Sequence, residues 1–189
     1  MFKSIFSTSF NAFDLGGEGG TGLIQAARNG HNDILQKLLN DGAEINTTEL
    51  MFHHSALMAA ALNGHLKSVK LLLNAGADPS LKDTSKRTAL LLAATNNHFS
   101  VIKHLFNVKR NGRQRDSNGN GIWHLLAMSD GQKNTVEEPT EIAKKDKENL
   151  NLMKELISQG VSLDSINSDG ETALMIAVKR ENLKLVKIL

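Results

Sequence analysis

Cysteine and tyrosine are both absent from this 189-residue chain, and proline occurs only twice. The absence of cysteine excludes disulfides, thiolate-bound zinc and a cysteine nucleophile. Long hydrophobic runs are missing as well, since none comes near the ~20 residues that a membrane-spanning helix needs. The first ten residues, MFKSIFSTSF, lack the continuous apolar core of a secretory signal. These absences predict a soluble, intracellular protein of the reducing cytoplasm.

Neither sign of charge is in excess. Lysine and arginine number 22 against 20 aspartate and glutamate, which leaves a formal net charge of +2. This balance argues against a dedicated nucleic-acid binder, although a local basic patch remains compatible with it. About 40% of the residues are hydrophobic and 22% are charged, which is a globular and not a disordered composition.

The chain repeats itself about every 33 residues. The segment that begins at Thr21 starts again at Ser55, Thr88, Gly121 and Thr172. The offsets are 34, 33, 33 and 51 residues, and the last equals 33 plus an 18-residue insertion. A second marker, a Leu/Ile-rich stretch that ends in glycine, keeps the same phase at 38–43, 72–77 and 156–161. Two markers in one phase predict five copies of one structural unit.

Each unit has the pattern of a helix–turn–helix. A threonine or serine is a good N-cap for a short Ala/Leu-rich helix, and Gly-His or Asn-His then makes the turn. The second helix carries apolar residues at i, i+1, i+4 and i+5, and a glycine such as Gly42 or Gly76 supplies the left-handed residue that ends it. Because one helix pair cannot bury its apolar face alone, the units must stack.

This pattern resembles the ankyrin repeat. The family signature T-P-L-H-x-A-A is matched by residues 88–94 and more loosely by 121–127, and its D-x-x-G-x-T opening by 116–121 and 167–172. The proline of the signature is replaced in every unit, and Lys109 stands where the third unit should have its loop glycine. The resemblance implies an all-α ankyrin-repeat solenoid whose loops project as fingers.

The repeats do not account for the whole chain. Residues 1–19 carry Phe2, Phe6, Phe10 and Phe13 at helical spacing. We interpret them as a capping segment followed by a glycine-rich joint; the alternative is an amphipathic anchor or partner-binding helix. The predicted units are 20–48, 49–82, 83–115, 116–166 with an insertion near 129–148, and an incomplete 167–189.

Two of these units are irregular. In the insertion, Thr135-x-x-Glu138 followed by Pro139 indicates a helix start, so we expect a polar loop leading into a second helix lengthened by a turn or two. At the C-terminus, apolar residues from Leu183 to Leu189 begin a second helix without a polar cap. We therefore expect either a longer parent protein or a partner that covers this end.

No catalytic, metal or cofactor site is predicted. The resemblance gives His31, His65, His98 and His124 a structural role, in which the imidazole bonds to the backbone. His53 and His54 are adjacent and lack the further ligands of a metal site, and no H-E-x-x-H, G-x-S-x-G or phosphate-binding loop occurs. We expect Trp123 in the core. We predict that the chain is not an enzyme and needs no cofactor.

The resemblance implies that fingers and the ends of the first helices form a concave face that binds a protein partner. Met51 and Phe52 are our preferred anchors, because apolar side chains at a finger tip have no core to fill. The alternative is that Phe52 folds back on its neighbouring loop. The predicted partner-binding residues are Arg28, Asn29, Met51, Phe52, His54, Leu62, Asn63, Thr84, Ser85, Arg87, Thr95, Asn96, Ser117, Asn118, Asn120, Met128, Lys179 and Arg180.

Two further hypotheses concern other residues. Lys109, Arg110, Arg113 and Arg115 form a basic cluster that could steer toward an acidic partner, phosphate or RNA, although no aromatic residue interleaves it. Asn46 lies in a context that resembles the family's sites of asparagine hydroxylation.

The function predicted from the sequence is that of a monomeric protein-binding module. One alternative is the targeting arm of a larger enzyme, and another is a basic-patch binder of nucleic acid or phosphoinositide. Abundant asparagine and lysine with scarce proline suggest an AT-rich genome, and hence an effector that an intracellular bacterium delivers to the cytosol or nucleus of a host cell.

Overall fold

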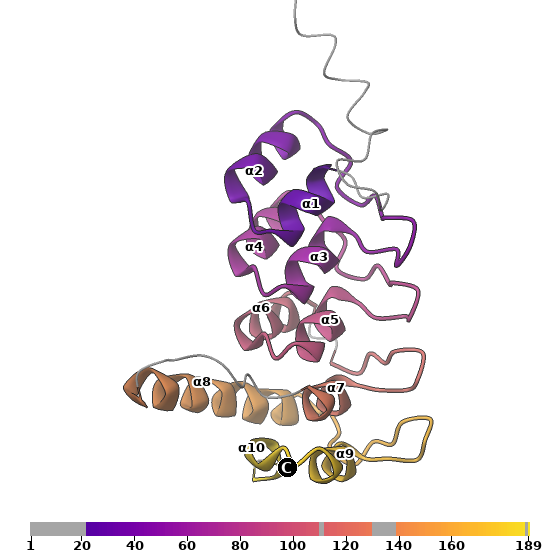
Figure 1. The fold of residues 1–189 in the computed structure, drawn as a ribbon, viewed down its shortest axis with the longest axis vertical. Coiled ribbons are helices and arrows are strands. Elements are labelled where there is room, and N and C mark those ends of the chain that lie inside the picture. The colour runs from indigo at the N-terminus through magenta and orange to yellow at the C-terminus, as the bar shows by residue number, and fades with distance from the viewer. Residues whose placement is uncertain (1–21, 110–111, 130–138, 188) are drawn as a thin grey trace, which may run out of the picture.

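The computed structural model describes residues 22–109, 112–129, 139–187 and 189, and these residues form five stacked helix pairs (Figure 1). The predictions for residues 1–19 and for Arg110 lie outside this part of the chain. Extended structure within it is limited to two isolated bridges. The pairs are α1 (Gly22–Arg28) with α2 (Asn32–Asn40), α3 (Ala56–Leu62) with α4 (Leu66–Asn74), α5 (Ala89–Thr95) with α6 (Phe99–Lys109), α7 (Ile122–Met128) with α8 (Pro139–Ser158), and α9 (Ala173–Lys179) with α10 (Leu183–Val186).

The stack has an inner and an outer layer of helices. The inner helices α1, α3, α5, α7 and α9 contact one another in that order, and the outer helices α2, α4, α6 and α8 do the same. Loops project from the ends of the inner helices to one side of the stack (Figure 1). The prediction of an all-α solenoid of helix–turn–helix units with projecting loops is confirmed.

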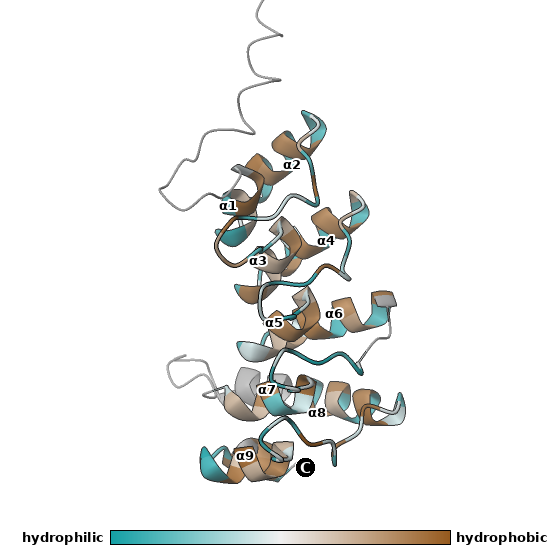
Figure 2. Ribbon diagram, turned by 90° about the vertical axis from the view of Figure 1, so that its right-hand side faces the viewer, coloured by the Kyte–Doolittle hydropathy of each residue, from teal (hydrophilic) through white to brown (hydrophobic). Residues whose placement is uncertain are grey.

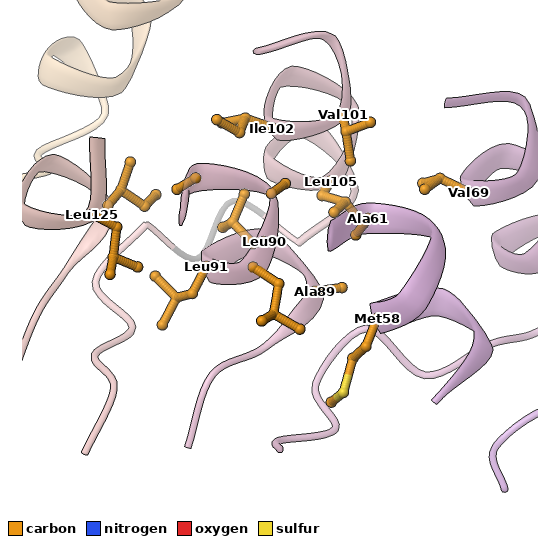
Figure 3. Packing of buried hydrophobic residues seen from close by; sticks show 14 of the residues in the cluster. Met58, Ala61, Val69, Ala89, Leu90, Leu91, Val101, Ile102, Leu105 and Leu125 are labelled. Atoms are coloured by element: carbon orange, nitrogen blue, oxygen red, sulfur yellow. The ribbon is translucent and has the colours of Figure 1, made fainter. Parts of the chain in front are cut away.

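Each described inner helix is seven residues long, and α3, α5, α7 and α9 each begin directly after the predicted cap residue. Thr88 does not cap α5 with its side chain as predicted, because its hydroxyl donates to Oε1 of Gln114 instead. The hydroxyls of Ser55 and Thr172 accept hydrogen bonds from the backbone N–H groups of Met58 and Met175, at 3.3 Å each. In α3 and α5 the first six residues are all buried, and alanines let neighbouring helices approach closely. Figure 3 shows this packing, with Met58 and Ala61 of α3 near Ala89 of α5 and Leu105 of α6. Apolar residues accordingly line the helix faces of the interior, and many loop segments are polar (Figure 2).

A histidine links each central turn to the unit before it. The rings of His65 and His98 lie against the left-handed glycines Gly30 and Gly64 of the preceding units. Their Nε2–H groups donate to the carbonyls of Arg28 and Leu62, both at 3.0 Å. In the fourth unit, Nε2–H of His124 donates to the carbonyl of Glu171 at 3.1 Å. The structural role that the sequence indicated for these three histidines is confirmed; His31, at the first turn, is exposed.

The insertion is partly helical. Helix α8 begins at Pro139, where the sequence predicted a start. It contains 20 residues against nine in α2 and α4. The difference of 11 residues is about three turns, so the prediction of one or two extra turns was too small. No helix in the described part of the chain is long and apolar enough to span a membrane.

The last unit presents an apolar end face. Leu174, Met175 and Val178 of α9 are exposed, whereas the equivalent residues of α3, from Leu57 to Ala61, are buried under the next unit. On α9, the side chains that correspond to the buried interface residues of α3 are therefore exposed.

Candidate protein-binding surface

The fingers share one backbone design. Their first residue is Asp83, Asp116 or Asn167, and its side-chain oxygen accepts hydrogen bonds from the N–H groups two and four residues later, at 2.7–3.0 Å. The fourth residue is left-handed and is either Lys86, with φ of 60°, or a glycine. The acceptor and the left-handed residue together hold each finger in one tight turn.

Backbone hydrogen bonds also join each finger to the next. The N–H of Thr84 donates to the carbonyl of Phe52 at 3.1 Å. Ser117 donates in the same way to Ser85 at 2.8 Å, and Ser168 to Asn118 at 2.9 Å. The four fingers from residue 49 to residue 172 therefore form one continuous ladder at the edge of the stack.

The first of these fingers, residues 49–54, is one residue longer than the others and has glutamate at its first position. Its tip carries Leu50, Met51 and Phe52, which are 82%, 58% and 47% exposed. The ring of Phe52 stacks on the imidazole of His54, with 5.6 Å between centroids and 25° between planes. The ring of Phe52 thus packs on a residue of its own finger, whereas the alternative interpretation had it fold back on the neighbouring loop, and Phe52 still presents about half of its surface.

A chain of ionisable side chains, here called the charge chain, lies under this tip. Glu49 is 3% exposed, and its Oε2 accepts a hydrogen bond of 2.5 Å from Nη2 of Arg28 in the preceding unit. The imidazole of His54 lies between Glu49, 3.0 Å from Nδ1, and Asp83 of the next finger, 3.5 Å from Nε2. Arg87 closes the chain through Nε at 2.8 Å from Asp83. The five residues connect three consecutive units beneath the apolar tip.

Burial favours the neutral form of His54. Burial lowers the pKa of His54, and the neighbouring carboxylates of Glu49 and Asp83 oppose the shift without overcoming it. Glu49 Oε1 and His54 Nε2 are both buried without a hydrogen bond among the described residues. The balance of these charges therefore depends on Arg28 and Arg87, each of which lies at a carboxylate.

The predicted partner-binding residues lie in the fingers and at the C-terminal ends of the inner helices, with differing access. The exposed ones are Asn29, Met51, Phe52, Asn63, Thr84, Asn96, Ser117, Asn118, Lys179 and Arg180. The half-buried ones are Arg28, Leu62, Ser85, Arg87, Thr95 and Met128. The amides of Asn29 and Asn63 donate to carbonyls four residues earlier, and the amide of Asn96 donates across to Leu62.

Two of the predicted residues are not accessible. His54 is buried in the charge chain, and Asn120 is 3% exposed. The amide of Asn120 donates to Asp116, and its oxygen accepts from Asn167 of the next finger, both at 3.1 Å. The expectation that both would be exposed finger residues was wrong, because both side chains point inward, where Asn120 bonds to Asp116 and Asn167 and His54 lies between Glu49 and Asp83.

The remaining sequence predictions concern Trp123, Asn46 and the basic cluster. Trp123 is buried and donates through Nε1–H to the carbonyl of Val161, which confirms it as a core residue. Asn46 is exposed, and its Oδ1 accepts from the N–H of Asp78 at 2.9 Å. Of the basic cluster, the described side chains are those of Arg113 and Arg115, and both are exposed. Among the described residues, no group of three or more His, Asp and Glu has the arrangement of a metal site.

Comparison with known families accounts for this architecture. A family model described as ankyrin repeats in three copies matches residues 3–83, 23–116 and 57–138, and one described as ankyrin repeats in many copies matches residues 141–189. The matches cover most of the sequence, and the chain belongs to the ankyrin repeat family. Repeats of this family generally act as protein–protein interaction modules and are typically not catalytic. A comparison with curated proteins found no match.

Proposed function

We propose that this chain binds a protein partner through the exposed tip of its 49–54 finger, with the neighbouring finger tips and inner-helix ends as the surrounding contact surface. Leu50, Met51 and Phe52 are the anchors. The observation that carries the proposal is the placement of three consecutive large apolar side chains in solvent on a loop. The equivalent tips of the other described fingers are Ser85-Lys86, Asn118-Gly119 and Asp169-Gly170.

The tip is held in place before any partner arrives. Phe52 accepts the ladder hydrogen bond from Thr84, and its ring rests on His54. His54 in turn is buried between the carboxylates of Glu49 and Asp83. Arg28 of the preceding unit pairs with Glu49, and Asp83 belongs to the next unit. A fixed loop loses little conformational freedom on binding, so more of the apolar contact energy contributes to affinity.

The chemistry of the tip indicates the shape of its partner. Three adjacent apolar side chains need an apolar pocket or groove, and burial of one such side chain contributes about 1.5–3 kcal/mol. The asparagine and serine side chains around the tip suit a polar rim. If the chain is the arm of a larger protein, or an effector in a host cell, this surface would supply its targeting, and only the identity of the partner would change.

The test compares tip variants with a matched apolar control. Proteins captured by the wild-type chain from a cell lysate are compared with those captured by the double variant Met51→Ala/Phe52→Ala. Val108→Ala is the control, because Val108 is an apolar residue on outer helix α6 with 49% exposure. We expect a partner that the control retains and the double variant loses.

Affinity measurement then separates the residues of the tip. Leu50→Ala removes the most exposed anchor without touching the His54 stack, and it should weaken binding of the captured protein about tenfold. Phe52→Ala should have an equal or larger effect. Equal capture by wild type, the double variant and Val108→Ala would contradict the proposed anchors.

A further inference from the structure

A hollow of about 340 Å³ lies where the third unit meets the fourth. Its walls are the loop of residues 112–115, the start of α7 and the loop of residues 160–165. The buried side chains of Ile122 and Trp123 line its apolar part. The Trp123 indole joins α7 to the loop of residues 160–165, because its N–H donates to the Val161 carbonyl at 3.2 Å.

Close packing fixes the shape of the hollow. A Cβ atom on Gly112 would come within 2.4 Å of the Val161 side chain, so the backbone at residue 112 packs directly against the opposite loop. Arg115 adds a second connection, since its Nη1 donates to the carbonyls of Gly119 at 2.7 Å and Ile166 at 3.2 Å. Both hydrogen bonds use one terminal nitrogen of the guanidinium.

The charged groups around the hollow are of one sign. Arg113 and Arg115 supply guanidinium groups, Ser162 and Ser165 supply hydroxyls, and the lining includes no carboxylate. In the described part of the chain neither arginine is in an ion pair. The nearest acidic residues by sequence are Asp116, which accepts hydrogen bonds within its own finger, and the exposed Asp164.

We propose that this hollow binds a single phosphate group, either as free phosphate or as a phosphorylated side chain. Two guanidiniums provide planar, paired donors that match phosphate oxygens, and serine hydroxyls add further donors. An extended nucleic acid is disfavoured, because Trp123 is buried and no aromatic ring of the lining is exposed for stacking. The site is separate from the apolar finger tip, so it does not depend on the proposed partner interaction.

Trp123 provides a probe of this site, because it is the only tryptophan in the chain. Tryptophan fluorescence is followed while inorganic phosphate replaces chloride at constant ionic strength, and the thermal unfolding midpoint is measured across the same series. We expect a saturable fluorescence change and a rising midpoint, because a ligand of the folded state stabilises it. If neither readout distinguishes phosphate from chloride, the proposal is overturned.

Arginine variants locate the effect. Arg113→Gln should weaken phosphate binding about tenfold or more, and Arg113→Lys, which keeps the charge but loses the paired geometry, should lie between it and wild type. Arg180→Gln is the control, since Arg180 is exposed at the end of α9 and does not line the hollow. An equal loss in Arg113→Gln and Arg180→Gln would show general charge attraction and overturn the site.

Two arms distinguish the source of the phosphate. N-acetyl-phosphoserine amide is compared with its unphosphorylated form, and a short single-stranded RNA is tested in parallel. Stronger binding of the phosphoserine probe than of inorganic phosphate identifies a phosphorylated side chain as the ligand, and the reverse order identifies free phosphate. RNA that binds more tightly than both and depends equally on Arg113 and Arg180 contradicts the proposal.

Discussion

The imidazole of His98 lies directly over Gly64 of the preceding unit, so closely that a Cβ atom on the glycine would fall 2.5 Å from the ring. The same ring donates to the Leu62 carbonyl at 3.0 Å. Gly64 therefore has two separate reasons to be glycine: its φ of 75° and the histidine above it. The turn of one unit is thereby the docking surface for the next.

Alanine substitutions at Gly76 and Gly64 separate the effect of the positive φ from the effect of the histidine contact. Gly76→Ala, at φ of 94° with open space around it, should lower the free energy of unfolding by about 1 kcal/mol through backbone strain alone. Gly64→Ala should cost about 1–3 kcal/mol more, because the new methyl group displaces His98. Urea unfolding of both variants checks this, and equal losses would show that the histidine contact adds nothing.

The buried charge chain predicts a large effect of Glu49. Glu49→Ala removes the carboxylate that pairs with Arg28 and His54, and we expect a loss of about 3 kcal/mol in the free energy of unfolding. The matched control is Lys37→Ala, which breaks an exposed pair with Asp41 on α2 and should change stability by less than about 0.5 kcal/mol. A loss at Glu49 no larger than that of the control would contradict the role given to this chain.

Stability should fall in mild acid. Burial lowers the pKa of His54, His98 and His124 in the folded state, so below an unfolded-state pKa of about 6.5 the unfolded chain binds more protons. The stabilising contribution is complete above that pH and is lost as the pH falls through the folded-state values. Urea unfolding between about pH 7.5 and pH 5.5 should show this decline. His98→Gln should flatten it, and an unchanged slope in that variant would contradict the assignment.

Two equivalent finger positions should respond in opposite directions. Lys86 holds a left-handed φ of 60°, and Lys86→Gly should raise the free energy of unfolding by about 0.5 kcal/mol. Gly119 holds the same place in the next finger, where a Cβ atom would lie 3.1 Å from the backbone nitrogen of Ser168. Gly119→Ala should therefore lower stability by more than about 1 kcal/mol. Thermal unfolding of the two variants checks this prediction. Unfolding midpoints that shift in the same direction in both variants would contradict the shared finger geometry.

The sequence was sufficient to predict the fold, because its period and caps are local signals. The spacing of Thr88 from Gly121 sets one unit, and Pro139 marks the start of α8. The chemistry beneath the fingers was not predictable in the same way. His54 and Asn120 are residue types common in exposed loops, and only the tertiary structure shows that their side chains turn inward. Asn120 accepts a hydrogen bond from Asn167 of the next finger, and His54 lies between Glu49 and Asp83.

One signal for the charge chain was present and was missed. Counted by the repeat, Glu49 occupies the position of Asp83 and Asp116, whose side chains cap the finger backbone. A longer side chain in a finger with one extra residue cannot make the same short bonds, and it reaches Arg28 instead. Leu50, the most exposed residue of the tip, was not among the predicted anchors.

The ladder hydrogen bonds that join the finger tips run between backbone atoms. Apart from the left-handed fourth position, a tip residue can therefore change identity while its joint to the next finger persists. Recognition and folding depend on different atoms of the same loop. Natural selection or a protein engineer could exchange the tips one at a time, and the same scaffold would acquire a new specificity without being rebuilt.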